Sequence, residues 1–294
     1  MGHRVTVGIA VVAALGCTGG AFYWLHGRNV RPEHALRSAP PFLPSANAAG
    51  RKGAAAGESA PAEASKRGAA DPEAGLALRA GEVLEYTANV AKLNNVANLR
   101  LQVSERRSFL GKNAWHLQAF AHTENPLRMM FVLDDQFDSY SDAGTMASLQ
   151  YEMHLDERGQ KVNSVQRMTA TGKEPAPADA TETRVLPGTR DPLGMMQYLR
   201  NVDWTKTPEV RSPVYDGRKL YDVRAKLADS SEVVSVPAGN FTASKIELRV
   251  FDNGAEMKDA RFALYLANDA MRTPVLLEAV LPFATARVEL KSSR

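Results

Sequence analysis

Histidines are the first residues in this chain whose type could do chemistry. His116 and His122 fall on the same face of one predicted strand, because an even number of residues separates them. At 3.3 Å per residue they lie about 20 Å apart, so they cannot bind one metal ion together. His154 falls on the polar face of another predicted strand. The histidines therefore predict no metal site, and we expect no cofactor.

An acidic cluster follows, made of Asp134, Asp135, Asp138 and Asp142. A calcium loop needs acidic ligands at alternate positions and a central glycine, and this order does not provide them. Ser139 and Ser141 lie among these acids, but no Gly-x-Ser-x-Gly turn surrounds either. The sequence favours a protein that is not an enzyme. A hydrolase that uses Asp138 and Asp142 as its pair of acids is kept as an alternative.

Alternating apolar and polar residues fill the chain from Arg79 onward. A period of two is typical of strands that have one buried face. The clearest runs are residues 84–90, 96–103, 115–121, 149–155 and 244–250. Turn signals rich in glycine, asparagine and aspartate separate them, which favours an antiparallel arrangement of about ten or eleven strands. Residues 171–182 are predicted to form a surface loop.

One helix is predicted, at the segment that begins with Asp191. Asp191 can cap the first turn, Pro192 suits the first helical position, and Arg200 complements the dipole near the C-terminal end. The apolar residues gather roughly along one side and are Leu193, Met195, Met196, Leu199 and Val202. A single apolar helix among antiparallel strands must pack on a face of the sheet.

The N-terminal segment is apolar. Residues 5–26 contain no Lys, Arg, Asp or Glu, and as a helix they would span about 33 Å, enough to cross a bilayer. An uncleaved membrane anchor is the first interpretation. A cleaved signal peptide is the second, since a short apolar run with small residues would suffice. Lipidation at Cys17, the only cysteine, is the third.

A stretch rich in Ala, Gly, Pro and Ser separates this segment from the strands. Residues 1–78 hold eight Lys or Arg and five Asp or Glu, which leaves 28 of each for the rest of the chain. The β-rich part is therefore neutral and lacks the basic surface of a nucleic-acid binder. We predict an anchor or signal at residues 1–26, a disordered linker at 27–78 and a β-rich domain at 79–294.

Several short motifs resemble, in order and spacing, a family of bacterial exported proteins of unknown function. They are Gly81 to Tyr86, Phe137 to Asp142, Asp191 to Leu193 with Leu199 and Arg200, Val236 to Phe241 with Lys245 to Glu247, and Asn268 and Asp269 with Thr273 to Val275. This family is related in fold to lipoprotein carriers and receptors of the Lol type. The resemblance implies a curved antiparallel sheet, an incomplete β-barrel, wrapped around one helix, and it implies no enzyme activity.

The sequence and the resemblance together predict a membrane-tethered protein of the cell envelope that holds a lipid or acyl chain in an apolar groove. The residues expected to line the groove are Tyr86, Leu99, Leu101, Trp115, Leu117, Met195, Met196, Leu199, Ile246 and Leu248. The main alternative is an assembly factor that docks a lipoprotein or another envelope protein. In either case the membrane is a partner through the N-terminal helix, and nucleic acid is not.

We expect a single-pass protein of the bacterial inner membrane with its C-terminal domain in the periplasm. The flanking charges conflict with this orientation, because Arg28, Arg31 and Arg37 follow the apolar segment and only Arg4 precedes it. The long linker and the family resemblance favour export. A soluble exported protein or a lipoprotein is the alternative location.

Overall fold

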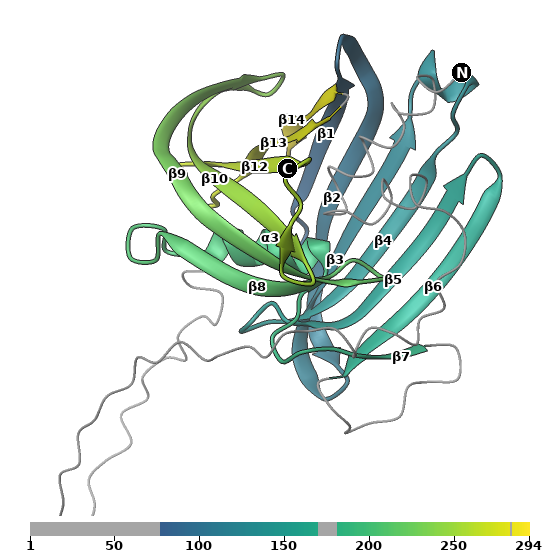
Figure 1. Ribbon diagram of the computed structural model, residues 1–294, viewed down its shortest axis with the longest axis vertical. Helices are drawn as coiled ribbons and strands as arrows, with labels where there is room; N and C mark the ends of the chain where they lie inside the picture. The colour runs from purple at the N-terminus through teal and green to yellow at the C-terminus, as the bar shows by residue number, and fades with distance from the viewer. Residues whose placement is uncertain (1–76, 170–180, 283) are drawn as a thin grey trace, which may run out of the picture.

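The computed structural model of the chain describes residues 77–169, 181–282 and 284–294, and almost all of them belong to one large sheet (Figure 1). The predicted anchor and most of the predicted linker lie outside the described residues. The strands are β1 Val83–Val90, β2 Leu93–Phe109, β3 Lys112–Thr123, β4 Asp134–Asp142, β5 Ser148–Glu157, β6 Gln160–Thr169, β7 Thr181–Arg184, β8 Glu209–Tyr215, β9 Leu220–Val236, β10 Gly239–Asp252, β11 Ala255–Glu256, β12 Arg261–Ala267, β13 Pro274–Leu281 and β14 Ala284–Ser293.

The strands are ordered β7-β6-β5-β4-β3-β2-β1-β14-β13-β12-β10-β9-β8, and β11 pairs with β10 off this path. Neighbouring strands are antiparallel except β6 and β7, which are parallel. The first and last long strands meet in the middle, where Ala88 of β1 lies opposite Val288 of β14. The sheet is open, with β7 and β8 at its edges. Its fourteen strands exceed the predicted ten or eleven, and Thr181 and Glu182 lie in β7 rather than in a loop.

The two long strands β9 and β10 carry the curvature. Their pairing shifts register around Ala243 and Lys245, and such irregularities bend a strand. Beyond the bend, the hairpin between them reaches β14, where the Ala238 amide donates to the Leu290 carbonyl over 2.9 Å. Figure 1 shows this hairpin arching over β12–β14. The result is a sheet curved on itself, as an incomplete barrel.

One α-helix, α3 Pro192–Asn201, lies inside this curve (Figure 1). It contacts β3, β4 and β8, so it packs on the inner face of the sheet as the sequence predicts. A short 3₁₀ helix, η2 Leu127–Met129, lies in the connection between β3 and β4. No helix within the described residues is long and apolar enough to cross a membrane; the predicted span at residues 5–26 falls outside them.

The core consists of two clusters of apolar side chains, one on each side of α3. The larger gathers the inner faces of β1 to β5 and of β13 and β14, and includes Tyr86, Leu99, Trp115 and Leu117. The smaller gathers β8, β9, β10 and β12 around Met195 and Leu199 of the helix. The predicted alternation is therefore confirmed on the strands nearest the helix. Met195 is fully buried and Met196 half-buried, so the helix presents Met195 more directly to the core.

Candidate ligand-binding site

A small apolar cavity of about 50 Å³ lies between α3 and strands β10, β12 and β13. Its wall is made of Leu101, Pro192, Leu193, Met195, Met196, Leu199, Leu248, Phe262, Ala263, Leu264, Leu277 and Glu278. At roughly 10–15 Å³ for one water molecule, the enclosed space holds about three or four waters. It falls well short of the roughly 300–1,000 Å³ of a pocket that encloses a drug-sized ligand.

The structure brings together five of the ten residues predicted for the groove: Leu101, Met195, Met196, Leu199 and Leu248. The others are core residues away from the cavity wall. Leu99, Trp115 and Leu117 belong to the larger cluster and Ile246 to the smaller one. Tyr86 is also buried in the larger cluster, and its hydroxyl donates to the Pro274 carbonyl over 2.8 Å.

Sequence reasoning missed the part of the wall made by β12 and β13. Phe262 and Leu264 alternate along β12, and Leu277 pairs with Leu264 across to β13. This alternation is a signal that the sequence carries. What it does not carry is the position of the helix over the sheet, which decides which inward residues border a void and which fill the core.

A buried polar cluster fixes the N-terminal end of α3. Asp191 is fully buried and accepts hydrogen bonds from the Gly194 amide (2.8 Å) and from the hydroxyls of Ser139 (2.5 Å) and Ser148. The Asp191 amide donates to the Ser148 oxygen over 2.6 Å. Burial raises the pKa of Asp191, and the bonds from Ser139, Ser148 and Gly194 partly oppose that rise. The predicted N-cap is therefore confirmed, and it also binds the helix to β4 and β5.

A buried ion pair fixes the other end of the helix. Arg200 donates from both terminal nitrogens to the Glu82 carboxylate, over 2.8 Å each, and also to the Met271 carbonyl and the Gln197 side chain. The sequence indicated Arg200 only as a partner of the helix dipole. Nothing in its spacing from Glu82 pointed to this pair, which joins α3 to the start of β1.

The predicted acid and histidine candidates lie on the other side of the sheet or at its ends. Asp138 accepts from His116 (2.8 Å), Gln118 (2.8 Å) and Gln136 (2.7 Å) on the outer face. Burial opposes ionisation of Asp138, but these three bonds together hold its pKa below the ordinary value. Asp142 caps the turn after β4 by accepting from the Thr145 amide.

The histidines have separate partners. His116 stacks on Tyr140 with 4.5 Å between ring centroids, His122 contacts Glu124 at 2.8 Å, and His154 approaches Glu152 at 3.5 Å. In the part of the chain that the structure describes, no group of three or more His, Cys, Asp or Glu residues is placed to hold a metal ion.

Comparison with known proteins decides the family. The model of a family described as "Protein of unknown function (DUF3108)" matches residues 85–291, which is most of the chain. The chain belongs to the DUF3108 family. This bears out the resemblance to a bacterial family of unknown function. A search of curated proteins found no match to this DUF3108 protein.

Solved structures resemble this DUF3108 protein only distantly. A β-barrel-like protein of the DUF1849 domain from Brucella abortus is 12% identical over 73% of this chain and 97% of its own, with a TM-score of 0.46. A "putative exported protein with YmcC-like fold" from Bacteroides fragilis is 10% identical over 74% and 96%, with a TM-score of 0.34. A "putative lipoprotein" from Parabacteroides distasonis is 14% identical over 74% and 96%, with a TM-score of 0.35. No functional conclusion rests on these likenesses.

Proposed function

We propose that this protein is a non-enzymatic, membrane-tethered protein of the cell envelope that binds the apolar part of a lipid or acyl chain between α3 and the curved sheet. The cavity beside α3 is the observation that supports this. Its wall is built from aliphatic, thioether and aromatic side chains, with Glu278 as the only charged residue, so it offers burial and no chemistry.

The size of the cavity limits what it encloses. About 50 Å³ accommodates only the end of an acyl chain, so the remainder has to lie along half-buried residues beside the cavity. Met196, Phe262 and Leu277 are such residues, each partly exposed and each in contact with the apolar core. Methionine side chains are flexible, so Met195 and Met196 can move to enlarge the space when a chain enters.

Tethering is proposed from residues 5–26, whose length and apolar character fit a membrane anchor. A periplasmic location is proposed with it. A role in docking another envelope protein is retained as the alternative, and it predicts that the cavity stays empty.

The test is native mass spectrometry of the full chain purified from its own membranes. We expect a fatty acid or phospholipid adduct on the wild type and its loss in Met196→Trp, whose larger ring fills the cavity. Tyr198→Trp is the matched control, because Tyr198 lies on the same helix but outside the cavity wall. Wild-type protein without adduct, or an adduct that survives in Met196→Trp, contradicts the proposal.

A further inference from the structure

Exposed large apolar side chains gather at one end of the sheet. Six are exposed within the described residues, and five of them form what we call the apolar rim: Leu93, Met129, Met130, Val162 and Val280. Met129 is 84% and Met130 66% exposed. Single exposed apolar residues are ordinary on a protein surface, whereas a group of them on neighbouring turns indicates an interaction site.

Backbone hydrogen bonds join the turns that carry the rim. The Ala91 amide donates to Thr285 (2.9 Å), the Glu124 amide to Val96 (2.9 Å) and the Arg158 amide to Val132 (2.9 Å). The turns between β1 and β2, β3 and β4, β5 and β6, and β13 and β14 therefore lie at the same end of the sheet. They are spread over eight adjacent strands, about 34 Å at 4.8 Å per strand.

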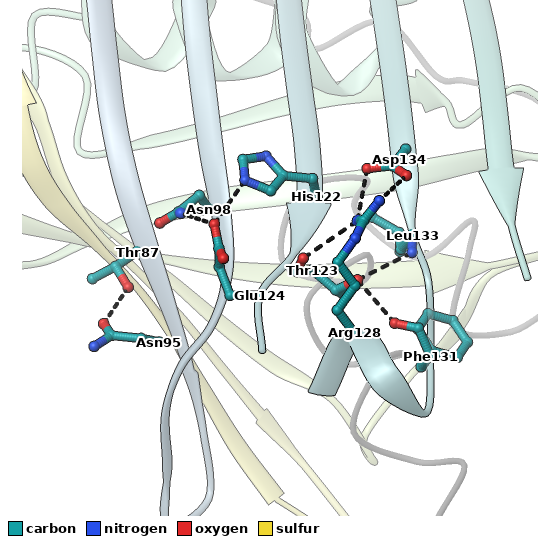
Figure 2. A network of polar contacts seen from close by, with 10 residues as sticks. All are labelled: Thr87, Asn95, Asn98, His122, Thr123, Glu124, Arg128, Phe131, Leu133 and Asp134. Carbon is teal, nitrogen blue, oxygen red and sulfur yellow. Dashed lines mark hydrogen bonds and ion pairs between the residues drawn. The ribbon is translucent and has the colours of Figure 1, made fainter. Parts of the chain in front are cut away.

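The loop that presents the two methionines is held in place by polar contacts, as Figure 2 shows. The buried Thr123 hydroxyl donates to the Phe131 carbonyl (2.8 Å) and accepts from the Leu133 amide (3.1 Å). Arg128 binds Asp134 through both terminal nitrogens, at 2.9 and 2.7 Å. Exposure of Met129 and Met130 is therefore a property of an ordered loop.

A cation accompanies each part of the rim. Lys92 precedes Leu93, Arg128 precedes Met129, Lys161 precedes Val162, and Arg261 lies opposite Val280 in the sheet. Arg128 and Lys161 also contact Asp134 and Asp156, but such exposed ion pairs are weak. Long cationic side chains beside protruding apolar ones suit a phospholipid surface, where the apolar groups enter the acyl region and the cations remain among the phosphates.

A bilayer fits this rim better than a protein partner does. The energetic centre of a protein interface is enriched in Trp and Tyr gathered in one well-packed patch. The exposed large apolar residues of the described chain include no aromatic residue, and those of the rim stand on separate turns along an arc. A fluid surface accommodates separate protrusions without matching their shape.

The rim is continuous with the cavity. Phe262 of the cavity wall follows Arg261, and Leu277 lies three residues before Val280. We propose that the apolar rim docks on a phospholipid bilayer, so that the open side of the cavity faces the lipid from which its ligand comes. This rests on the proposed function for its purpose, whereas the contact with lipid can be measured without any ligand in the cavity.

The experiment uses the full chain with Cys17→Ser, reconstituted in vesicles of phosphatidylcholine and phosphatidylglycerol. A single cysteine replaces Met130 in one variant and Val233 in another, and each carries an environment-sensitive fluorophore. Val233 is the matched control, because it is apolar and 72% exposed but lies on β9 outside the rim. Both variants share the same anchor, so differences between them report on the domain.

Lipids with a spin label in the acyl chain should quench the fluorophore at position 130 at least about threefold more than that at 233, because only position 130 enters the acyl region. Equal quenching at the two positions, or none, overturns the proposal. A blue shift at position 130 that depends on protein concentration and not on lipid also overturns it, in favour of a second copy as partner. Loss of quenching while a lipid adduct persists separates failure of docking from failure of the proposed function.

Discussion

At the scale of single residues, Asp135 is the least satisfied acid of the described chain. It is 3% exposed, one carboxylate oxygen accepts from the Asp156 amide over 3.0 Å, and the other is buried without a partner. Burial, with a smaller contribution from the charge of Glu157, raises the pKa of Asp135 from 3.8 to about 7. The folded protein therefore keeps a proton on Asp135 at a pH where the unfolded chain has lost it.

This difference predicts how stability changes with pH. As the pH rises from about 4 to 7, the unfolded chain loses its Asp135 proton first, so this residue lowers the free energy of unfolding. We expect Asp135→Asn to remove that decline. The stability of the variant relative to wild type should increase between pH 5 and pH 8, by at most about 3 kcal/mol. Urea unfolding followed by tryptophan fluorescence at both pH values measures it.

The control is Asp134→Asn at the neighbouring position. Asp134 is exposed, and its hydrogen bond with Arg128 holds its pKa below the ordinary value. Its replacement should leave the change between pH 5 and pH 8 as in wild type. The same change in Asp135→Asn as in wild type would show that Asp135 is ionised in the folded protein.

At the scale of elements, α3 illustrates what the sequence can and cannot predict. Its start at Asp191 and its placement on the sheet followed from cap chemistry and apolar spacing. The alternation of β1 to β3 likewise identified the inward residues. The ion pair of Arg200 with Glu82 did not follow, because 118 residues separate the two and no periodicity connects them. Half of the predicted groove residues proved to be filled core, since a void depends on packing between elements.

Gly194 tests how closely α3 approaches the strands. A Cβ atom placed there would lie 2.8 Å from the Ser141 oxygen and 3.0 Å from the Met146 carbonyl oxygen. Alanine is the better helix former by about 1 kcal/mol, so propensity alone predicts that Gly194→Ala stabilises the protein. We expect the opposite, a loss of about 1–3 kcal/mol, because the backbone at Met146 cannot move away without disturbing the turn after β4.

Gly144→Ala is the matched control for this substitution. The nearest atom to its added Cβ is a carboxylate oxygen of Asp142 at 3.6 Å, an ordinary contact. Its melting temperature should stay close to that of wild type, whereas that of Gly194→Ala should fall by several degrees. A Gly194→Ala variant as stable as wild type would show that the helix can shift away from the sheet.

At the scale of the whole molecule, the two ends of the open sheet approach each other. Gln166 of β6 donates to the Gly217 carbonyl in the turn between β8 and β9 over 2.7 Å. A Cβ atom at Gly217 would lie 2.4 Å from the Met153 side chain of β5, which shows how closely that turn packs on the β5–β6 edge. A direct contact between the two edges therefore helps to hold the curvature around α3, although no strand pairing closes the barrel.

Replacement of Gln166 by leucine tests whether this contact holds the curve. The leucine retains the volume but cannot donate, so the Gly217 carbonyl loses its partner at a cost of about 1–3 kcal/mol. We expect faster amide hydrogen exchange in β6, β7 and β8 together, because both edges are released at once, and unchanged exchange in β1 and β14 at the centre of the sheet. Gln102→Leu on β2, remote from both edges, should change none of these rates. Faster exchange confined to β6 would mean that each edge is stable by itself and that the bend of β9 and β10 alone maintains the curvature.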